Sequence, residues 1–251
     1  MARTAWYIGA SEHEVGEAAL LLGDRARIDR IAEHLEAPHI LPENRGLRTV
    51  TGLRGGRRVT ATAFGMGGPI AAIVLHELFD LGVRRFLRIG TAMAMPPAKL
   101  GDYVVAEGAL RGDGASLTYA PLGYPAIADY RLVAALRAEL ERRNAPWKAG
   151  LFGTYDGFYT QMFSLSEGQT QPVEALRHEA QQLDLIATDM ETATLLVAGR
   201  RLGAEVASLC LATVDGLTQL KLDPAVCAAR ERQMFEIALD VLAAPREGGS
   251  P

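Results

Sequence analysis

Short apolar runs that end at a glycine alternate with longer stretches of helical period along most of this chain. The runs at 58–64 and 85–89, for example, end at Gly65 and Gly90. This alternation is typical of an α/β domain, in which helices cover the faces of a largely parallel or mixed sheet. We therefore predict a single three-layer α/β domain, with a central mixed β-sheet flanked by helices.

The same pattern predicts where the individual elements lie. Strands are expected over residues 17–22, 47–53, 58–64, 85–89, 103–107, 147–155 and 205–214. Helices are expected over residues 25–35, 69–81, 129–143, 172–182, 191–202 and 223–242. The glycine pair at 55–56 is expected to form a hairpin turn, whereas residues 111–128 are polar and irregular.

Length and charge indicate one ordinary globular domain. The chain has 251 residues and no internal repeat, low-complexity segment or linker that would divide it. We therefore predict one domain over residues 1–251, with residues 245–251 as a frayed tail. The 26 Lys and Arg against 30 Asp and Glu give a formal charge of −4, which argues against a dedicated nucleic-acid-binding protein.

The cysteines and histidines show no spacing typical of a disulfide framework or a metal site. Cys210 and Cys227 form no C-x-x-C pair, and the histidines show no H-x-x-x-H or HExxH spacing. The sequence also lacks a signal-peptide pattern and a run of ~18 apolar residues long enough to span a membrane. We expect a cytoplasmic protein with reduced thiols, no bound metal and no membrane contact.

Three strand ends marked by glycine are candidate ligand sites, namely Gly23-Asp24, 65–69 and Gly90-Thr91. Ligands of α/β sheets gather where strands end and where helix N-termini present free N–H groups. None of the three sites matches the GxGxxG or Walker A pattern, so a nucleotide cofactor is not supported. A tight turn without any ligand is the alternative at each site.

Two arginines lie close to these strand ends. Arg27 is expected one turn into the helix after Gly23, and Arg88 stands in an apolar strand just before Gly90 and Thr91. A charge inside an apolar strand is costly unless it meets an anion or a carboxylate. A bound anion shared by Arg27, Arg88 and Thr91 satisfies this requirement, and so do structural salt bridges.

Asp189, Met190 and Glu191 place two carboxylates at the start of a predicted helix. Acidic residues at this position commonly cap the helix N-terminus, which contributes ~1 kcal/mol. The alternative is that one carboxylate accepts hydrogen bonds from a polyol such as ribose. The spacing alone leaves both roles open.

Four collinear motifs resemble those of the nucleoside phosphorylase superfamily and, within it, are most similar to the uridine phosphorylases. They are F-L-R-I-G-T at 86–91, D-G-A-S-L at 113–117, A-P-L at 120–122 and M-E-T-A-T-L-L at 190–196. The similarity runs from about residue 6 to about residue 242. It implies a pentosyltransferase that uses phosphate to cleave a (deoxy)ribonucleoside into free base and (deoxy)ribose 1-phosphate.

The resemblance implies a phosphate site built from a glycine loop, a strand end and a neighbouring subunit. Its residues are Gly23, Arg27, Arg88, Thr91 and, from the neighbouring subunit, Arg45. An arginine that acts across subunits implies a homo-oligomer, with a dimer as the active unit and a hexamer as the expected assembly. Inorganic phosphate is then a co-substrate beside the nucleoside, and no metal or organic cofactor is implied.

The resemblance also implies contacts to the sugar and the base. The ribose residues are Tyr7 of the adjacent subunit, Asp189, Met190 and Glu191. The base residues are Met93, Phe158, Gln161, Met162 and Asp215. Met93 and Met162 stand where the family carries a glycine and, in uridine phosphorylases, a glutamine, so the resemblance implies an altered base pocket.

Two catalytic roles follow from the resemblance. Arg88 is expected to orient the attacking phosphate, and Asp215 either protonates a purine leaving group or caps the turn after the last strand. The altered base pocket keeps three alternatives open beside a uridine-phosphorylase-like enzyme. They are a purine nucleoside phosphorylase, a hydrolytic nucleosidase that needs no phosphate, and a non-catalytic nucleoside-binding protein.

Overall fold

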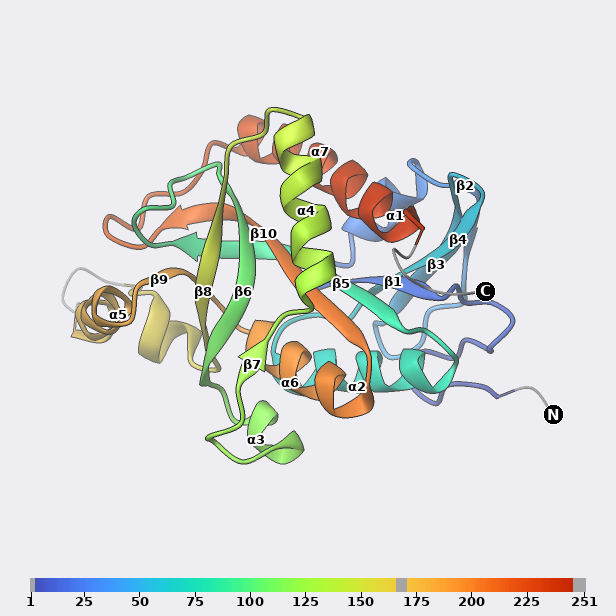
Figure 1. Cartoon of the computed structure of the whole chain (residues 1–251), viewed down its shortest axis with the longest axis horizontal. Helices are drawn as coiled ribbons and strands as arrows, with labels where there is room; N and C mark the ends of the chain where they lie inside the picture. Colours follow the sequence, from blue (N-terminus) through green and yellow to red (C-terminus); the bar gives the residue numbers. More distant parts are fainter. Residues whose placement is uncertain (1–2, 166–170, 246–251) are drawn as a thin grey trace.

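A twisted central sheet with helices on both faces forms the body of the protein (Figure 1). The computed structural model describes residues 3–165 and 171–245. The strands are β1 (Ala18–Leu22), β2 (Glu36–Ile40), β3 (Arg48–Arg54), β4 (Arg57–Ala63), β5 (Arg85–Ala94), β6 (Tyr103–Gly112), β7 (Ala126–Ile127), β8 (Trp147–Tyr155), β9 (Leu185–Asp189) and β10 (Glu205–Asp215). The predicted α/β class, mixed sheet and three layers are confirmed.

The strand order is β10-β6-β8-β9-β5-β1-β4-β3-β2, with β7 beside β6. β5 pairs in parallel with β1 and β10, and antiparallel with β9. Because β10 also pairs with β6, the strands β5, β9, β8, β6 and β10 close on themselves, whereas β1, β4, β3 and β2 form an open extension. β5 therefore belongs to both halves of the sheet.

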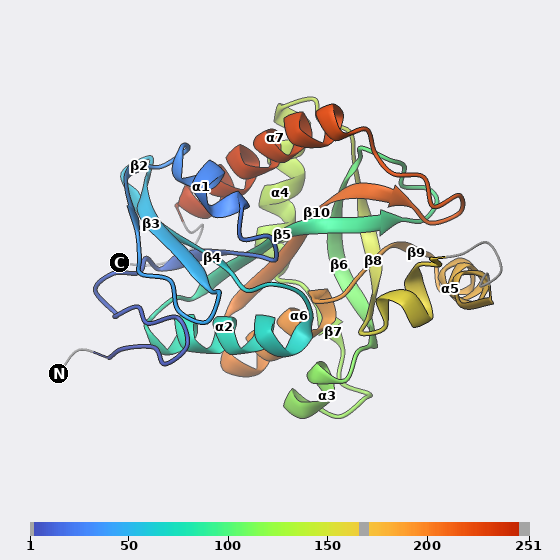
Figure 2. The ribbon, with the colours of Figure 1, turned by 180° about the vertical axis from the view of Figure 1, so that it is seen from behind.

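The helices cover the two faces of this sheet and its closed end. They are α1 (Arg27–Ala32), α2 (Gly68–Asp80), α3 (Ala115–Tyr119), α4 (Tyr130–Arg142), the π-helix η1 (Phe158–Met162), α5 (Gln171–Gln182), α6 (Thr192–Leu202) and α7 (Pro224–Ala243). Figures 1 and 2 show α2 and α6 together on one face, with α1, α4 and α7 on the other. α5 and η1 lie beside β8 and β9.

Local signals place the helix ends close to where the sequence predicts them. Asp129 accepts hydrogen bonds at 3.0 and 3.1 Å from two backbone N–H groups in the first turn of α4, and Asp223 does the same at 2.9 and 3.1 Å for α7. Gly203, with a φ of 83°, ends α6 in the left-handed region that glycine favours. None of the described helices has the length and apolar content needed to cross a membrane.

The short elements β2, β7, β9 and α3 lie outside the sequence prediction. All five residues of the edge strand β2 are exposed, so the sequence there carries no apolar period. β9 is fully buried but only five residues long, and it follows α5 without a glycine to mark its start. Of the predicted tail, only Pro245 falls within the described residues.

One buried guanidinium organises the segment between β6 and α4, which the sequence indicates only as polar and irregular. Arg111 donates to Ser116 Oγ at 3.0 Å and to the backbone oxygens of Ser116 and Ala120 at 2.9 and 2.7 Å. Asp113 accepts from the backbone N–H of Ser116 at 2.7 Å and from the hydroxyl of Thr194 in α6. The D-G-A-S-L and A-P-L motifs thus fold this segment onto α6.

Replacing Arg111 with Met should lower the free energy of unfolding by at least about 3 kcal/mol, because the buried oxygens around it lose a charged donor. Urea unfolding followed by circular dichroism measures the change. The control is Arg142→Met, because the Arg142 side chain is 64% exposed and its ion pair contributes less than about 1 kcal/mol. Equal effects of the two substitutions would contradict the structural role of Arg111.

Candidate active site

At one edge of the sheet, the carboxyl ends of β1 and β4 lie beside the middle of β5, which continues to Ala94. β1 pairs in parallel with β4 on one side and with β5 on the other, so Gly23 comes next to Gly65 and reaches the level of Gly90. The N–H of Gly65 donates to the backbone oxygen of Gly23 at 3.0 Å. A Cβ atom on Gly23 would lie 2.7 Å from the backbone oxygen of Gly65, so only glycine allows this close approach. The three predicted glycine sites therefore converge.

Arg88 of β5 lies at the centre of this edge. It is 4% exposed, and its Nη1 lies 3.0 Å from Asp189 Oδ2 and 2.6 Å from Cys210 Sγ, while Nη2 donates to Glu191. Burial lowers the pKa of this guanidinium, but electrostatic contact with Cys210 and the two carboxylates outweighs burial and raises the pKa. Arg88 therefore keeps its charge in the interior, and the predicted salt-bridge alternative is confirmed for it.

Glu191 connects Arg88 to the glycine loop that precedes α2. One carboxylate oxygen accepts from Arg88, and the other accepts from the backbone N–H of Gly67 at 2.7 Å. Gly67 has a φ of 100°, which favours glycine. Although Glu191 stands at the N-cap position of α6, its side chain makes no capping hydrogen bond to that helix. Capping, one of its two predicted roles, is therefore not what this carboxylate does.

Asp189 fills the capping role in its place. It is 3% exposed and accepts from the Thr154 hydroxyl at 2.8 Å, and from both the hydroxyl and the backbone N–H of Thr192 in the first turn of α6. Its remaining contact is the ion pair with Arg88. These contacts hold the Asp189 carboxylate in the interior, where it supports Arg88 and the start of α6, and its ribose contact stays a prediction.

Gly90 and Thr91 lie within β5, next to Arg88. The predicted strand end at Ile89 is wrong, because β5 continues through Gly90 and Thr91 to Ala94. Thr91 is the one exposed residue among the ten of this strand, so its side chain is accessible. A Cβ on Gly90 would lie 2.9 Å from the guanidinium of Arg88, so glycine leaves room for that group. The predicted Arg-x-Gly-Thr motif thus combines a buried cation with an accessible side chain.

Arg27 lies in the first turn of α1, after the Gly23 loop. It is 6% exposed and forms an ion pair with Glu231 of α7. Its Nε lies 3.8 Å from Asp24 Oδ2, and the Nε atoms of both Arg27 and Arg88 are buried without a hydrogen-bond partner. Both predicted anion-binding arginines are therefore held by carboxylates and retain unused donors.

An apolar cluster lies beside the carboxylates and brings the predicted base residues together. Met93 and Met162 are buried in it, and Phe158 and Met190 pack against them partly exposed. The ring of Phe158 stacks on that of Phe163, with centroids 5.5 Å apart. The predicted base and sugar residues Met93, Phe158, Met162 and Met190 therefore belong to one apolar cluster.

The two polar residues predicted to reach the base are engaged locally. Gln161 Oε1 accepts from the backbone N–H of Gly157 at 3.0 Å, within the turn that leads into η1. Asp215 Oδ1 accepts from the N–H groups of Leu217 and Thr218 at 3.0 and 2.7 Å, and from the Thr218 hydroxyl at 2.9 Å.

These contacts also affect the pKa of Asp215. Burial raises it, but the hydrogen bonds from Thr218 and Leu217 outweigh burial and hold the pKa below its usual value. A general acid needs the opposite shift, toward neutral pH. The structure therefore supports turn capping, which the sequence left open, over proton donation by Asp215.

Tyr7 and Arg45, the residues predicted to act on a neighbouring subunit, lie together. The guanidinium of Arg45 lies 5.0 Å from the centroid of the Tyr7 ring, and Asn44 donates to the backbone oxygen of Tyr7 at 2.9 Å. Arg45 is exposed, whereas Tyr7 is half-buried. Within the described chain neither side chain hydrogen-bonds to Arg27 or Arg88.

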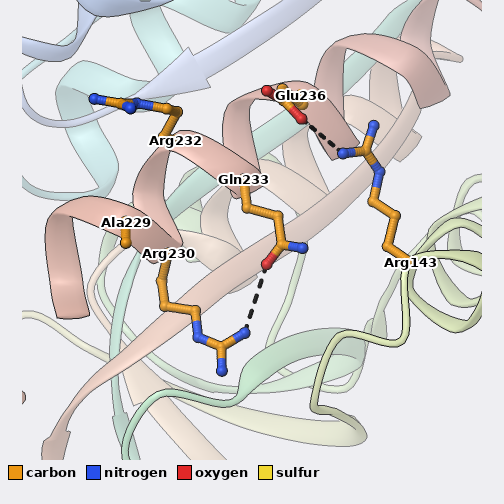
Figure 3. A pocket seen from close by; sticks show the side chains of 6 residues that line it. All are labelled: Arg143, Ala229, Arg230, Arg232, Gln233 and Glu236. Carbon is orange, nitrogen blue, oxygen red and sulfur yellow. Dashed lines mark hydrogen bonds and ion pairs between the residues drawn. The ribbon is translucent and has the colours of Figure 1, made fainter.

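A cavity of about 390 Å³ lies elsewhere, between α7 and the end of α4 (Figure 3). Arg143, which lines it, donates to Glu139, Glu236 and Asp240, so its charge is already compensated. Figure 3 shows Arg232 pointing away from the other side chains. The described residues contain no group of three or more side chains arranged to hold a metal ion.

Sequence reasoning missed two contributors to the site, Cys210 and Glu231. It placed Gly67 within the candidate ligand loop at 65–69 but did not identify its backbone N–H as a donor to Glu191. Cys210 is singled out in the sequence only as an unpaired thiol, yet it contacts Arg88. Glu231 lies in the middle of a long helix, 204 residues from its partner Arg27, so no local signal marks it.

The comparisons with known proteins identify the class. The Phosphorylase superfamily profile matches residues 17–243, so the chain belongs to that superfamily, as the motifs predict. Uridine phosphorylase of Treponema pallidum is 36% identical over 199 residues, which cover 77% of this chain and 76% of that relative. Guanosine phosphorylase of Halorubrum lacusprofundi is 32% identical over 206 residues, which cover 82% and 80%.

A solved structure shows the same fold. Uridine phosphorylase from Vibrio fischeri ES114, complexed with 6-hydroxy-1-naphthoic acid, is similar with a TM-score of 0.86 and 28% sequence identity. The similarity covers 95% of this chain and 96% of that chain. The single-domain arrangement of sheet and helices is thus shared along nearly the whole length.

The two thiols should differ sharply in reactivity. Cys210 is fully buried, and burial raises the pKa of its thiol to about 11 although Arg88 acts in the opposite direction. At pH 8 its thiolate fraction is then roughly one in a thousand. A disulfide exchange reagent should therefore titrate only the partly exposed Cys227 in native protein, and both thiols in denaturant. Native Cys227→Ser protein that still reacts rapidly would contradict this assignment.

Proposed function

We infer that this protein is a nucleoside phosphorylase, a pentosyltransferase that reversibly exchanges the base of a (deoxy)ribonucleoside for phosphate. The observation that carries the inference is the buried, charged Arg88, held by Asp189 and Glu191 at the sheet edge where Thr91 is exposed. Its similarity to uridine and guanosine phosphorylases over 77% and 82% of the chain supports the same activity.

In this proposal, phosphate binds to the donors at the converging strand ends. Arg27 and Arg88 supply guanidinium N–H groups, Thr91 supplies a hydroxyl, and the loop at Gly23 allows close approach to the backbone. Charge-assisted hydrogen bonds to an oxyanion are strong, and donors fixed before the reaction need no reorganisation in the transition state. Phosphate is the only co-substrate in this proposal, and no metal or organic cofactor takes part.

Glu191 joins the phosphate and sugar sites. Its carboxylate already touches Arg88, and a ribose hydroxyl that donates to it would lie next to the bound phosphate. Cleavage of a glycosidic bond passes through a sugar with oxocarbenium character, so the nucleophile and the leaving base must flank the anomeric carbon. Met190 packs against the sugar in this arrangement, and Phe158 packs against the base.

The base site selects by shape more than by polar contacts. Its walls include Met93, Phe158 and Met162, while Gln161 and Asp215 are engaged in backbone hydrogen bonds. Apolar pockets separate similar ligands by only ~10–200-fold, and methionine side chains adapt to ligand shape. We propose uridine as the substrate, with purine nucleosides second because of the similarity to a guanosine phosphorylase.

The proposed active unit is a dimer in which Tyr7 and Arg45 complete the neighbouring site. The exposed position of Arg45 against the ring of the half-buried Tyr7 supports this arrangement. Assembly into a hexamer and a cytoplasmic location stay predictions.

Arg88→Ala should reduce phosphate-dependent base release at least ~100-fold, because fixed donors to a reacting oxyanion contribute on this scale. The measurement is release of base from uridine, thymidine, inosine and guanosine, each with and without phosphate. Arg142→Ala, a surface substitution, is the matched control and should retain wild-type rates.

The same panel separates the alternatives. Base release without phosphate would identify a hydrolytic nucleosidase, and tight nucleoside binding without any release would identify a non-catalytic binding protein. Near-normal phosphorolysis by Arg88→Ala would refute the assignment of Arg88.

Mixed oligomers test the role of Arg45. Arg45→Ala and Arg88→Ala subunits should each form weakly active oligomers, but a mixed dimer contains one site with both arginines. Random pairing should restore up to about a quarter of the wild-type activity. The measurement is the phosphorolysis activity of the two variants after they are refolded together. If this activity does not exceed the sum of the activities of the variants refolded separately, Arg45 does not act across subunits.

A further inference from the structure

Glu231 of α7 is a buried carboxylate that bridges both arginines of α1. Its side chain is only 8% exposed. One oxygen accepts from Arg27 Nη2, and the other accepts from Arg30 Nη1 at 2.7 Å. A single acidic side chain therefore fixes two cations that precede it by about 200 residues.

The two arginines depend on Glu231 to different extents. Arg30 is 39% exposed and also lies 5.5 Å over the ring of Phe235. The side chain of Arg27 is 7% exposed. Its other carboxylate neighbour is Asp24, whose Oδ2 lies 3.8 Å from Arg27 Nε and whose side chain is 49% exposed. Among the described residues, Glu231 is thus the buried carboxylate that holds Arg27.

α1 needs this support because it is short. It has six residues, and Ala26 at its N-cap makes no side-chain capping hydrogen bond. Helices of this length are not stable without tertiary contacts. Ile28 and Ile31 anchor its apolar face in the core, but they do not orient the long side chain of Arg27.

We propose that Glu231 is a positioning residue for phosphate binding. It holds one edge of the Arg27 guanidinium and leaves the buried Nε–H, which has no hydrogen-bond partner, available to an oxyanion at the Gly23 loop. The Arg27 side chain then loses its conformational entropy when the protein folds, and not when phosphate binds. The proposal rests on the proposed function, in which Arg27 binds phosphate.

The sign of the effect distinguishes positioning from competition. A carboxylate that merely neutralised Arg27 would weaken phosphate binding, so removing its charge would lower the KM for phosphate. A carboxylate that positions Arg27 has the opposite effect, because glutamine replaces one of the two acceptor oxygens with an NH2 group, which cannot accept a hydrogen bond from an arginine. If the role of Glu231 is purely structural, its replacement would change the melting temperature but not the KM for phosphate or for the nucleoside.

The test measures kcat and the KM for phosphate and for uridine in Glu231→Gln. We expect the KM for phosphate to rise roughly tenfold, equivalent to about 1.4 kcal/mol, while the KM for uridine changes less than about twofold. Glu231→Asp keeps the charge, so it should show a smaller rise and carries the test if the glutamine variant does not fold. An unchanged or lower KM for phosphate in the folded variants would overturn the proposal.

Glu236→Gln is the matched control on the same helix. Its carboxylate accepts from Arg143 at 2.7 Å and lies 3.9 Å from His34 Nδ1, but within the described chain it forms no ion pair with Arg27 or Arg30, so this variant should keep the wild-type KM for phosphate. Stabilisation of each protein by inorganic phosphate during thermal unfolding gives a second readout that needs no turnover. Wild-type protein that binds phosphate but does not use it would refute the proposed function alone, whereas equal stabilisation of wild type and Glu231→Gln would refute the role of Glu231.

Discussion

The rest of the site depends on the buried ion pairs that Arg88 forms with Asp189 and Glu191. A guanidinium inside a sheet is tolerated only when carboxylates compensate its charge, and here they come from the end of β9 and the start of α6. Glu191 then binds the loop before α2 through Gly67. One charge therefore ties together elements that are more than 100 residues apart, at the edge where the glycine-marked strands converge.

Both arginines of the site are paired with carboxylates before any substrate binds. Glu231 holds Arg27 as Asp189 and Glu191 hold Arg88, so each cation is oriented by a buried acid. Such an arrangement keeps two arginines in the interior without uncompensated charge, and it presents their remaining donors in fixed directions. The proposed base site beside them is built differently, from apolar side chains that adapt to ligand shape.

Local sequence predicted the residues whose roles depend on their immediate neighbours. Gly23 follows the end of β1, and Arg88 is conspicuous as a charge within an apolar run, so their proximity follows from the parallel pairing of β1 and β5. The predicted end of β5 before Gly90 is wrong, because the strand continues through Thr91 to Ala94. The roles of Asp189 and Asp215 were harder to predict, because a carboxylate near a helix or turn can cap the backbone or reach a ligand. In the structure, Asp189 accepts from the buried Thr154 hydroxyl and Asp215 accepts from the backbone N–H of Thr218, so both carboxylates make interior or backbone contacts. β9 escaped prediction because a short buried strand leaves no period.

The sequence by itself determined the α/β class, the glycine-marked ends of β1 and β4, and the superfamily. These properties follow from apolar period and from short motifs, which neighbouring residues specify. Only the tertiary structure decided that half of the sheet closes on itself, that Asp189 supports Arg88, and that Glu231 holds Arg27. Each of these depends on a pairing between residues far apart in the chain, and such a pairing is set by packing of the whole fold and leaves no mark in local sequence.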